Sequence, residues 1–438
     1  MENPAAPEYF LDAFPRDAFP QWVWQDGQRP AALPDQVWLS ETTHRDGQQG
    51  GLPLSLDTSR RIYDILCEVT GDSGVIRHAE FFPYRDSDRE ALRYALDRHA
   101  DGAPIEPTTW IRGRREDVML IKEIGVRETG LLSSASDYHT FHKFGTGGRT
   151  TAAEMYLEAV TIALDHGIRP RVHLEDTTRA SVDFVSALVE EVLRIAEHYP
   201  TSLRPRFRVC DTMGIGLPYD EVALPRSVPR WVRLLRGLGL TPTQIEFHPH
   251  NDTWLVVANC LAAIKEGCAV ISGTTLGTGE RTGNAPLEAV MVHLLGMGYW
   301  PGERLNLPAV NKLVALYEDI GAGPSPKYPL FGRDAYVTRA GIHADGLNKF
   351  WWMYAPFNAP LLTGRELDVA LTKDSGQAGL IFVLGKRLGR QLEKGDPRVA
   401  EVLAWLDGQW DSGRVTAVDW HELEPVVAKA FAEDGSST

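Results

Sequence analysis

The sequence is poor in the features that accompany secretion, membrane insertion or nucleic-acid binding. Its four cysteines show no CxxC spacing and lie within apolar runs, which favours reduced core thiols and a cytoplasmic protein. No signal-peptide pattern opens the chain, and no run of about 18 apolar residues is present, so we expect no membrane partner. The net charge is −14 without a basic cluster, which indicates that nucleic acid is not a partner.

Apolar residues make up 43% of the chain, and they follow the periods of helices and strands. Positions 62, 65, 66 and 69 show the spacing of a helix with one buried face. Such helical patterns alternate with eight strand-like runs, which predicts an α/β protein built on a (β/α)8 barrel. A doubly wound open sheet is the alternative, but it would not need eight units. The predicted strands span residues 37–42, 75–81, 108–111, 128–133, 171–175, 207–211, 244–248 and 270–275.

Beyond residue 301 this alternation stops, and we expect a smaller, mostly helical accessory region. A glycine- and proline-rich run at 321–326 has the composition of a linker. We therefore predict four parts, which are an N-terminal extension at 1–34, the catalytic barrel at 35–305, a linker and lid subdomain at 306–360, and a C-terminal accessory subdomain at 361–438.

Two histidines close the seventh predicted strand. His248 and His250 stand at i and i+2, so both imidazoles point to the same side of the strand. Asp46, after the first strand, adds a carboxylate at the same rim, since the active site of such a barrel lies at the C-terminal ends of its strands. We predict a divalent cation here, Mn, Co, Mg or Zn by ligand type, with Asn284 as a further ligand or a loop cap. Such a cation would act as a Lewis acid on a 2-oxo acid.

Other polar residues also follow predicted strands at this rim. Arg45 lies beside the predicted metal ligand, where its charge can stabilise a developing oxyanion. An ion pair with Glu80 is the other interpretation of Arg45, and one residue can do both. Polar residues gathered at one rim favour a functional site over chance.

Several motifs resemble those of the metallolyase barrels that include 2-isopropylmalate, homocitrate, citramalate and Re-citrate synthases. Their order along the chain, from Thr43 to Gly376, follows the family. The matching segments are 43–49 (THRDGQQ), 80–83 (EFFP), 136–139 (SDYH) with Lys143, 175–176 (ED), 211–214 (DTMG), 248–252 (HPHND), 279–284 (GERTGN), 341–346 (GIHADG) and 373–376 (KDSG).

This resemblance implies a Claisen condensation, in which the methyl carbon of acetyl-CoA attacks the ketone of a 2-oxo acid and hydrolysis releases CoA. By position, Glu175, His343 and Tyr354 match the family's acid–base group. Tyr354 is equally well explained as an aromatic core residue. The accessory region of these enzymes closes over the barrel of a partner subunit, which implies a homodimer. We expect substrate contacts from Arg45, Glu80, Arg85, His139 and Thr212.

The sequence lacks the residues that are typical of two related classes of enzyme. Carboxyltransferases carry a lysine where Cys210 stands, and 3-hydroxy-3-methylglutaryl-CoA lyases carry a cysteine in the loop at 277–281, which has none. A carbon–carbon lyase therefore remains only a distant alternative, and a catalytically silent barrel is disfavoured by the intact metal-binding set.

The substrate is expected to be a short 2-oxo acid with a second anionic group. Thr140 stands where homocitrate synthases place an arginine, His44 replaces a usual leucine, and Arg85 follows the second strand. Oxaloacetate and a phosphono- or phosphinopyruvate both fit. Homocitrate, isopropylmalate and citramalate synthases remain the alternatives.

Overall fold

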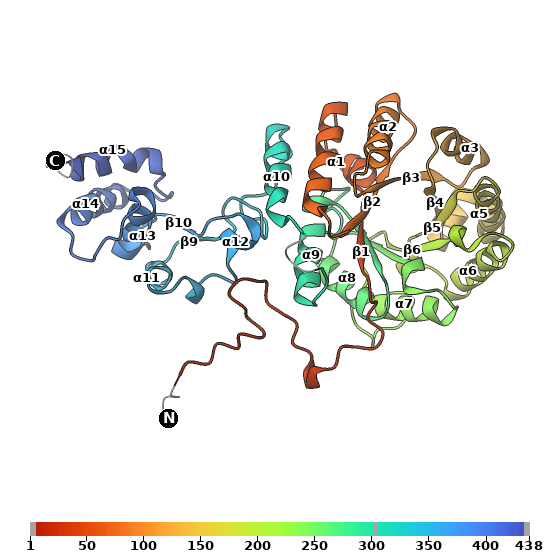
Figure 1. Cartoon of the computed structure of the whole chain (residues 1–438), viewed down its shortest axis with the longest axis horizontal. Coiled ribbons are helices and arrows are strands. Elements are labelled where there is room, and N and C mark those ends of the chain that lie inside the picture. Colours follow the sequence, from red (N-terminus) through yellow and green to blue (C-terminus); the bar gives the residue numbers. More distant parts are fainter. Residues whose placement is uncertain (1–5, 301–304, 433–438) are drawn as a thin grey trace. The chain divides into compact units, whose positions relative to one another are not determined.

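The computed structural model describes residues 6–300 and 305–432, and its centre is a closed barrel of eight parallel strands (Figure 1). The strands follow one another around the barrel in chain order, so each is paired with its neighbours in sequence and β8 closes on β1. This confirms the predicted (β/α)8 fold. The strands are β1 (Trp38–Glu41), β2 (Ile76–Phe81), β3 (Glu106–Arg112), β4 (Glu128–Ser134), β5 (Arg169–Glu175), β6 (Arg206–Asp211), β7 (Ile245–Pro249) and β8 (Val270–Gly273).

Helices surround the strands (Figure 1). In the first helix the side chain of Ser55 accepts a hydrogen bond from the Thr58 N–H, which satisfies a free donor at the helix start. Ile62, Leu66 and Val69 then form its buried stripe, as their spacing predicts. The helices are α1 (Leu56–Thr70), α2 (Asp86–Ala100), α3 (Arg115–Ile124), α4 (Asp137–Phe144), α5 (Gly148–Asp165), α6 (Val182–Ala196), α7 (Val228–Gly237), α8 (Val256–Lys265), α9 (Leu287–Gly296) and α10 (Val310–Asp319).

The chain divides into two compact units, of which Gln21–Pro324 holds the barrel and Met1–Pro20 with Ser325–Thr438 form the other. The second unit is mostly helical, as predicted. Its core gathers Leu380, Leu384 and Val399 with other aliphatic side chains. Its elements are β9 (Val337–Thr338), α11 (Gly341–Lys349), α12 (Ala359–Thr363), β10 (Asp368–Val369), α13 (Gly376–Leu388), α14 (Pro397–Asp411) and α15 (Trp420–Ala430).

The finer division at residues 34, 305 and 360 stays a prediction. Residues 1–5 of the predicted extension, 301–304 of the predicted barrel and 433–438 of the predicted C-terminal subdomain lie outside the described residues. Within the described ranges, every helix is too short or too polar to cross a lipid bilayer.

The barrel interior is polar, because alternate side chains of its strands that point inward carry charge. On β5, Arg171, His173 and Glu175 share one side, whereas Val172 and Leu174 share the other. In such barrels, inward side chains of alternate strands stack in layers of four. These layers place the charged residues of β5 and β7 directly beneath the rim where the site is predicted.

Candidate active site

The turn after β1 presents Arg45 and Asp46. It is a single π-helical turn, Thr43–Gly47, whose last N–H donates to the Thr42 carbonyl across 3.2 Å. Single π turns are rare and are frequently found at functional sites. Close approach of a second loop fixes this turn, because a Cβ on Gly50 would lie 2.2 Å from the backbone of Gly279. The loops that follow β1 and β8 are therefore in backbone contact.

Asp46 meets His248 of β7 and His250, which follows that strand, as predicted. Its Oδ2 lies 3.0 Å from His248 Nε2 and 3.8 Å from His250 Nε2, and all three side chains are buried. Ligand atoms of the three residues lie within 4.8 Å of one another. Neighbouring ligands on one octahedral ion with bonds of about 2.1 Å are roughly 3 Å apart, so this spacing fits a shared cation.

Asn284 lies beside this set, because its backbone forms an isolated antiparallel bridge with His250. Its amide nitrogen donates to the Thr278 carbonyl at 3.0 Å. Its amide oxygen is buried and has no hydrogen-bond partner among the described residues. Buried polar atoms without a partner are uncommon and call for a ligand or ion. The donor set therefore fits a divalent cation held by Asp46, His248, His250 and Asn284.

The protonation states suit metal binding, which needs neutral imidazoles and an ionised carboxylate. Burial lowers the pKa of His248, and it lowers the pKa of His250 to about 4. Burial alone would raise the pKa of Asp46, but the charge of Arg45 and the hydrogen bond with His248 hold it well below its usual value.

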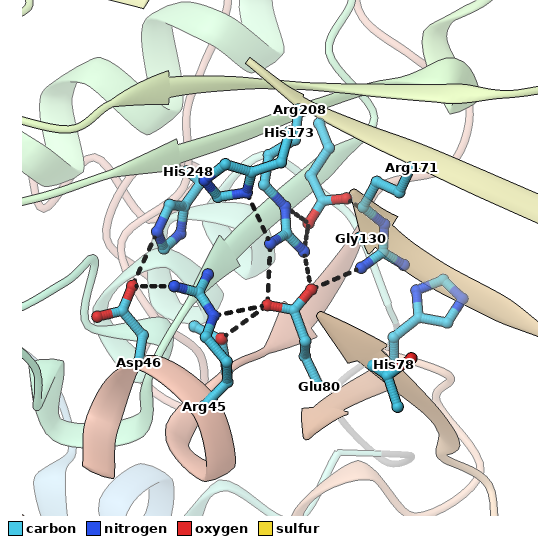
Figure 2. A network of polar contacts seen from close by, with 12 residues as sticks. Arg45, Asp46, His78, Glu80, Gly130, Arg171, His173, Arg208 and His248 are labelled. Atoms are coloured by element: carbon cyan, nitrogen blue, oxygen red, sulfur yellow. Dashed lines mark hydrogen bonds and ion pairs between the residues drawn. The ribbon is translucent and has the colours of Figure 1, made fainter. Parts of the chain in front are cut away.

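Arg45 is held in place by an ionic network inside the barrel (Figure 2). Its Nε donates to Glu80 Oε1 at 3.0 Å, and its Nη1 donates to Asp46 Oδ2 at 2.9 Å. Its Nη2 is buried without a hydrogen-bond partner in the described structure. The ion pair with Glu80 and the predicted stabilisation of an oxyanion are therefore compatible, because one guanidinium nitrogen of Arg45 has no partner in the described structure.

Glu80 is the centre of this network. Its carboxylate accepts hydrogen bonds from Arg208 at 2.7 and 2.9 Å and from Arg171 at 3.2 Å. Burial raises its pKa, but the charges of Arg208 and Arg45 hold the pKa well below its usual value. Glu80 thus positions Arg45, and its contact with substrate stays a prediction.

The part of the network that lies further inside the barrel was not predicted from the sequence. Arg171 and Arg208 are fully buried, and both also pair with Glu246 at 2.9 Å. Arg171 pairs with Glu128 as well. A period-two run of charged residues within a predicted barrel strand was the available signal, because one face of each such strand must point inward.

Glu175 lies at the rim in a cluster with residues of β4 and α4. Its Oε2 accepts hydrogen bonds from Lys143 Nζ at 2.6 Å and from the Ser134 hydroxyl, and it lies 3.0 Å from His139 Nδ1. Burial alone would raise the pKa of Glu175, but the hydrogen bonds from His139 and Lys143 outweigh it and lower the pKa to about 2. The predicted residues Glu175 and His139 are therefore brought together.

Thr212 and Arg85 lie on different sides of the rim. The Thr212 hydroxyl accepts a hydrogen bond from the Asp176 N–H at 2.8 Å, which ties the loops after β5 and β6. Arg85 is exposed and lines a cavity of about 700 Å³ beyond the ends of β2 and β3. The other lining residues are Gln48, Gln49, Phe82, Tyr84, Asp88, Trp110 and Arg112. The substrate contacts of Thr212 and Arg85 stay predictions.

His44 points away from this rim. Its Nε2 lies 2.9 Å from the Ser59 carbonyl of α1, and its ring stacks on Phe81 at a centroid distance of 4.3 Å. A buried histidine with these partners belongs to the packing between β1, β2 and α1.

His343 and Tyr354 belong to the second unit. Their rings pack against each other with centroids 4.3 Å apart, and Tyr354 remains 37% exposed. Tyr354 also lies close to Gly346, where a Cβ would meet its ring at 2.3 Å. The two predicted acid–base residues thus form a pair, and their part in the reaction stays a prediction.

Comparisons with known proteins agree with this arrangement. A family model described as HMGL-like matches residues 36–316. The chain is 83% identical over 434 residues to 2-phosphinomethylmalate synthase of Streptomyces hygroscopicus, covering 99% of both chains. It is 37% identical over 440 residues to citrate (Re)-synthase of Clostridium kluyveri, covering 99% of this chain and 96% of that protein.

A solved structure shares the fold. Hydroxymethylglutaryl-CoA lyase from Pseudomonas aeruginosa superimposes with a TM-score of 0.52 at 17% identity, over 66% of this chain and 94% of its own. The chain therefore belongs to the HMGL-like family, as the resemblance of its motifs to the metallolyase barrels predicts.

Proposed function

We propose that this chain condenses the acetyl group of acetyl-CoA with a short 2-oxo acid that carries a second acidic group. The methyl carbon loses a proton and bonds to the ketone carbon, whose oxygen takes up a proton. Water then cleaves the thioester, so that the products are CoA and a 2-hydroxy acid of the alkylmalate or citrate type. The observation that carries this proposal is the buried Asp46, His248 and His250 set beside a free donor of Arg45.

The metal-binding set supports the choice of reaction. Asp46, His248, His250 and Asn284 would hold Mn, Co, Mg or Zn, since carboxylate, imidazole and amide oxygen suit these ions. When bound, such an ion supplies Lewis acidity to the oxygens of a 2-oxo acid.

Arg45 supplies positive charge where the ketone oxygen becomes negative. Its Nη2 is the guanidinium donor without a protein partner, so it is free to donate to that oxygen. Glu80 and Asp46 hold the other two nitrogens at 3.0 and 2.9 Å. The donor is therefore preorganised, and it does not have to reorient during the reaction.

Glu175 contributes negative charge rather than proton transfer. A carboxylate whose pKa is about 2 is a weak base at neutral pH. Removal of the methyl proton and protonation of the ketone oxygen then fall to His343 and Tyr354. These two residues would act over the barrel of a partner subunit, as the family resemblance implies. We accordingly propose a homodimer. Four free cysteines favour a cytoplasmic location.

The relatives support the acidic substrate. The 2-phosphinomethylmalate synthase of Streptomyces hygroscopicus is 83% identical, and a citrate (Re)-synthase is 37% identical. A condensation that forms 2-phosphinomethylmalate joins an acetyl unit to phosphinopyruvate, and one that forms citrate uses oxaloacetate. Both 2-oxo acids are short and carry a second acidic group.

The test is release of CoA thiol from acetyl-CoA with a panel of 2-oxo acids, in metal-depleted protein with and without added Mn²⁺. We expect turnover with phosphinopyruvate, phosphonopyruvate or oxaloacetate, and abolition by a chelator. Arg45→Ala should lower kcat by about 100-fold or more, as loss of an oxyanion donor does elsewhere. A preference for 2-oxoisovalerate or pyruvate would contradict the acidic substrate, and metal-independent turnover would contradict the site.

A further inference from the structure

His173 lies in the layer of inward side chains that also holds His248. Inward side chains of alternate strands form such a layer, and here they come from the odd-numbered strands. The Arg45 Cζ lies 5.3 Å from the ring centroid of Trp110 on β3. The His173 ring on β5 lies 5.8 Å from that of Trp110 and 5.7 Å from that of His248 on β7. Trp110 is thus tied to the proposed chemistry through Arg45 and His248 through the metal set, and His173 contacts both rings.

Arg208 fixes the hydrogen-bonding character of His173. Its Nη1 lies 3.4 Å from His173 Nδ1, and the contact is buried. A guanidinium can only donate, so Nδ1 must be the acceptor and the ring proton must be on Nε2. Arg208 is itself held by Glu80 (Figure 2) and by Glu246. His173 therefore offers one N–H donor, and its direction is set by side chains that cannot move freely.

Trp110, the neighbour of His173 in this layer, lines the cavity beyond the ends of β2 and β3. Trp110 and Leu132 are only partly buried, whereas the residues beneath them are fully enclosed. A 2-oxo acid bound at Asp46 and His248 would bring the part beyond its ketone near His173, because the His173 ring lies 5.7 Å from that of His248. The Arg45 guanidinium, close to Trp110, adds positive charge on this side.

We propose that His173 Nε2–H is the donor that recognises the second acidic group of the 2-oxo acid, whether a carboxylate or a phosphorus acid. This rests on the proposed function and names the residue that sets its substrate class. Arg45 supplies charge, His173 supplies a directed hydrogen bond, and Trp110 closes the pocket with an apolar face. A 2-oxo acid without a second acidic group would leave this donor unpaired, which disfavours its binding.

The test compares wild type, His173→Phe and His173→Gln with oxaloacetate, phosphonopyruvate and pyruvate, in the full-length protein with Mn²⁺. Phenylalanine keeps the ring but removes the donor, and Arg208 Nη1 retains its bond to Glu80 at 2.9 Å. Glutamine places an amide N–H at a similar reach. His198→Phe, at an exposed position after α6, is the matched control.

We expect His173→Phe to lower kcat/KM for both acidic substrates by about 10- to 100-fold, mainly through KM, and to leave pyruvate within about threefold. His173→Gln should recover part of the loss. If pyruvate turns over too slowly, calorimetric binding of each acid without acetyl-CoA gives the same comparison. A fall in kcat/KM for only one of the two acidic substrates would identify the phosphorus acid or the carboxylate as the group that His173 recognises.

Equal losses for pyruvate and the acidic substrates would overturn the proposal, because that pattern marks a structural role. So would unchanged kinetics in His173→Phe with an unchanged melting temperature. Wild-type protein that releases no CoA with any 2-oxo acid would instead contradict the proposed function itself, so the two failures are distinguishable.

Discussion

Replacing Glu80 with glutamine tests the interior network that holds Arg45. Glu80 is fully buried, and its carboxylate accepts from Arg45, Arg171 and Arg208. The substitution removes a charge that all three guanidinium groups share, and it points an amide N–H at donors. Breaking a buried ion pair from one side costs about 3–5 kcal/mol. We expect the free energy of unfolding to fall by at least about 3 kcal/mol on this basis.

The assay is equilibrium unfolding in urea, followed by tryptophan fluorescence. With an m value of about 3 kcal/mol per M or more for a barrel of this size, the midpoint should shift by about 1 M. Glu191→Gln is the matched control, because the Glu191 and Arg194 side chains are 48% and 63% exposed and such pairs are screened by water. If the Glu80 variant unfolded at the same urea concentration as the Glu191 variant, the network would not be what stabilises the barrel interior.

Three further perturbations test other parts of the site. The pKa of Glu175 is lowered to about 2 from 4.5, so its stabilisation is complete above pH 4.5 and is lost as pH falls toward 2. The difference in unfolding free energy between wild type and Glu175→Gln should shrink by about 2 kcal/mol from pH 6 to pH 3 in urea titrations, and a constant difference would count against this ion cluster. His250→Ala should weaken Mn²⁺ binding by more than about 100-fold in calorimetry, whereas an unchanged affinity would show that the ion sits elsewhere. Gly130→Ala would bring a Cβ to 2.9 Å from Trp110 Cδ1 and 3.4 Å from Glu80 Oε2, so kcat/KM and the urea midpoint should both fall; wild-type values for both would contradict the close packing.

Local pattern was enough to predict the fold and the meeting of Asp46, His248 and His250. All eight predicted strands are present, because period-two runs and helical stripes are local signals that tertiary contacts here reinforce. Asp46 and His248 are 202 residues apart, yet both follow strands of one barrel, whose active sites share one rim. The fold therefore supplied the long-range information that spacing alone lacked.

The interior network could not be predicted in the same way. Glu80 meets Arg171 and Arg208 across the barrel, at sequence separations of 91 and 128 residues. Which inward residues meet depends on the stagger of neighbouring strands, which the sequence does not encode locally. His173 was missed for the same reason, since its neighbours Trp110 and His248 come from strands two positions away on either side.

For His44, the sequence indicated a role at the site that its position in the structure does not support. Its position beside Arg45 in the first motif indicated a further donor for an acidic substrate. In the structure it packs on Phe81 and against the Ser59 carbonyl, because a π-helical turn rotates successive side chains to different sides of the strand end. Proximity in sequence to a functional residue is therefore a weak guide within such a turn.

The most direct test of the proposed chemistry is the fate of the acetyl methyl carbon. Acetyl-CoA labelled with ¹³C at that carbon would be incubated with oxaloacetate or phosphinopyruvate and Mn²⁺, and the products read by NMR. We expect the label in a new methylene group bonded to the former ketone carbon, with none formed by His248→Ala. Labelled acetate as the sole product, or an equal yield of the new methylene from the His248 variant, would contradict it.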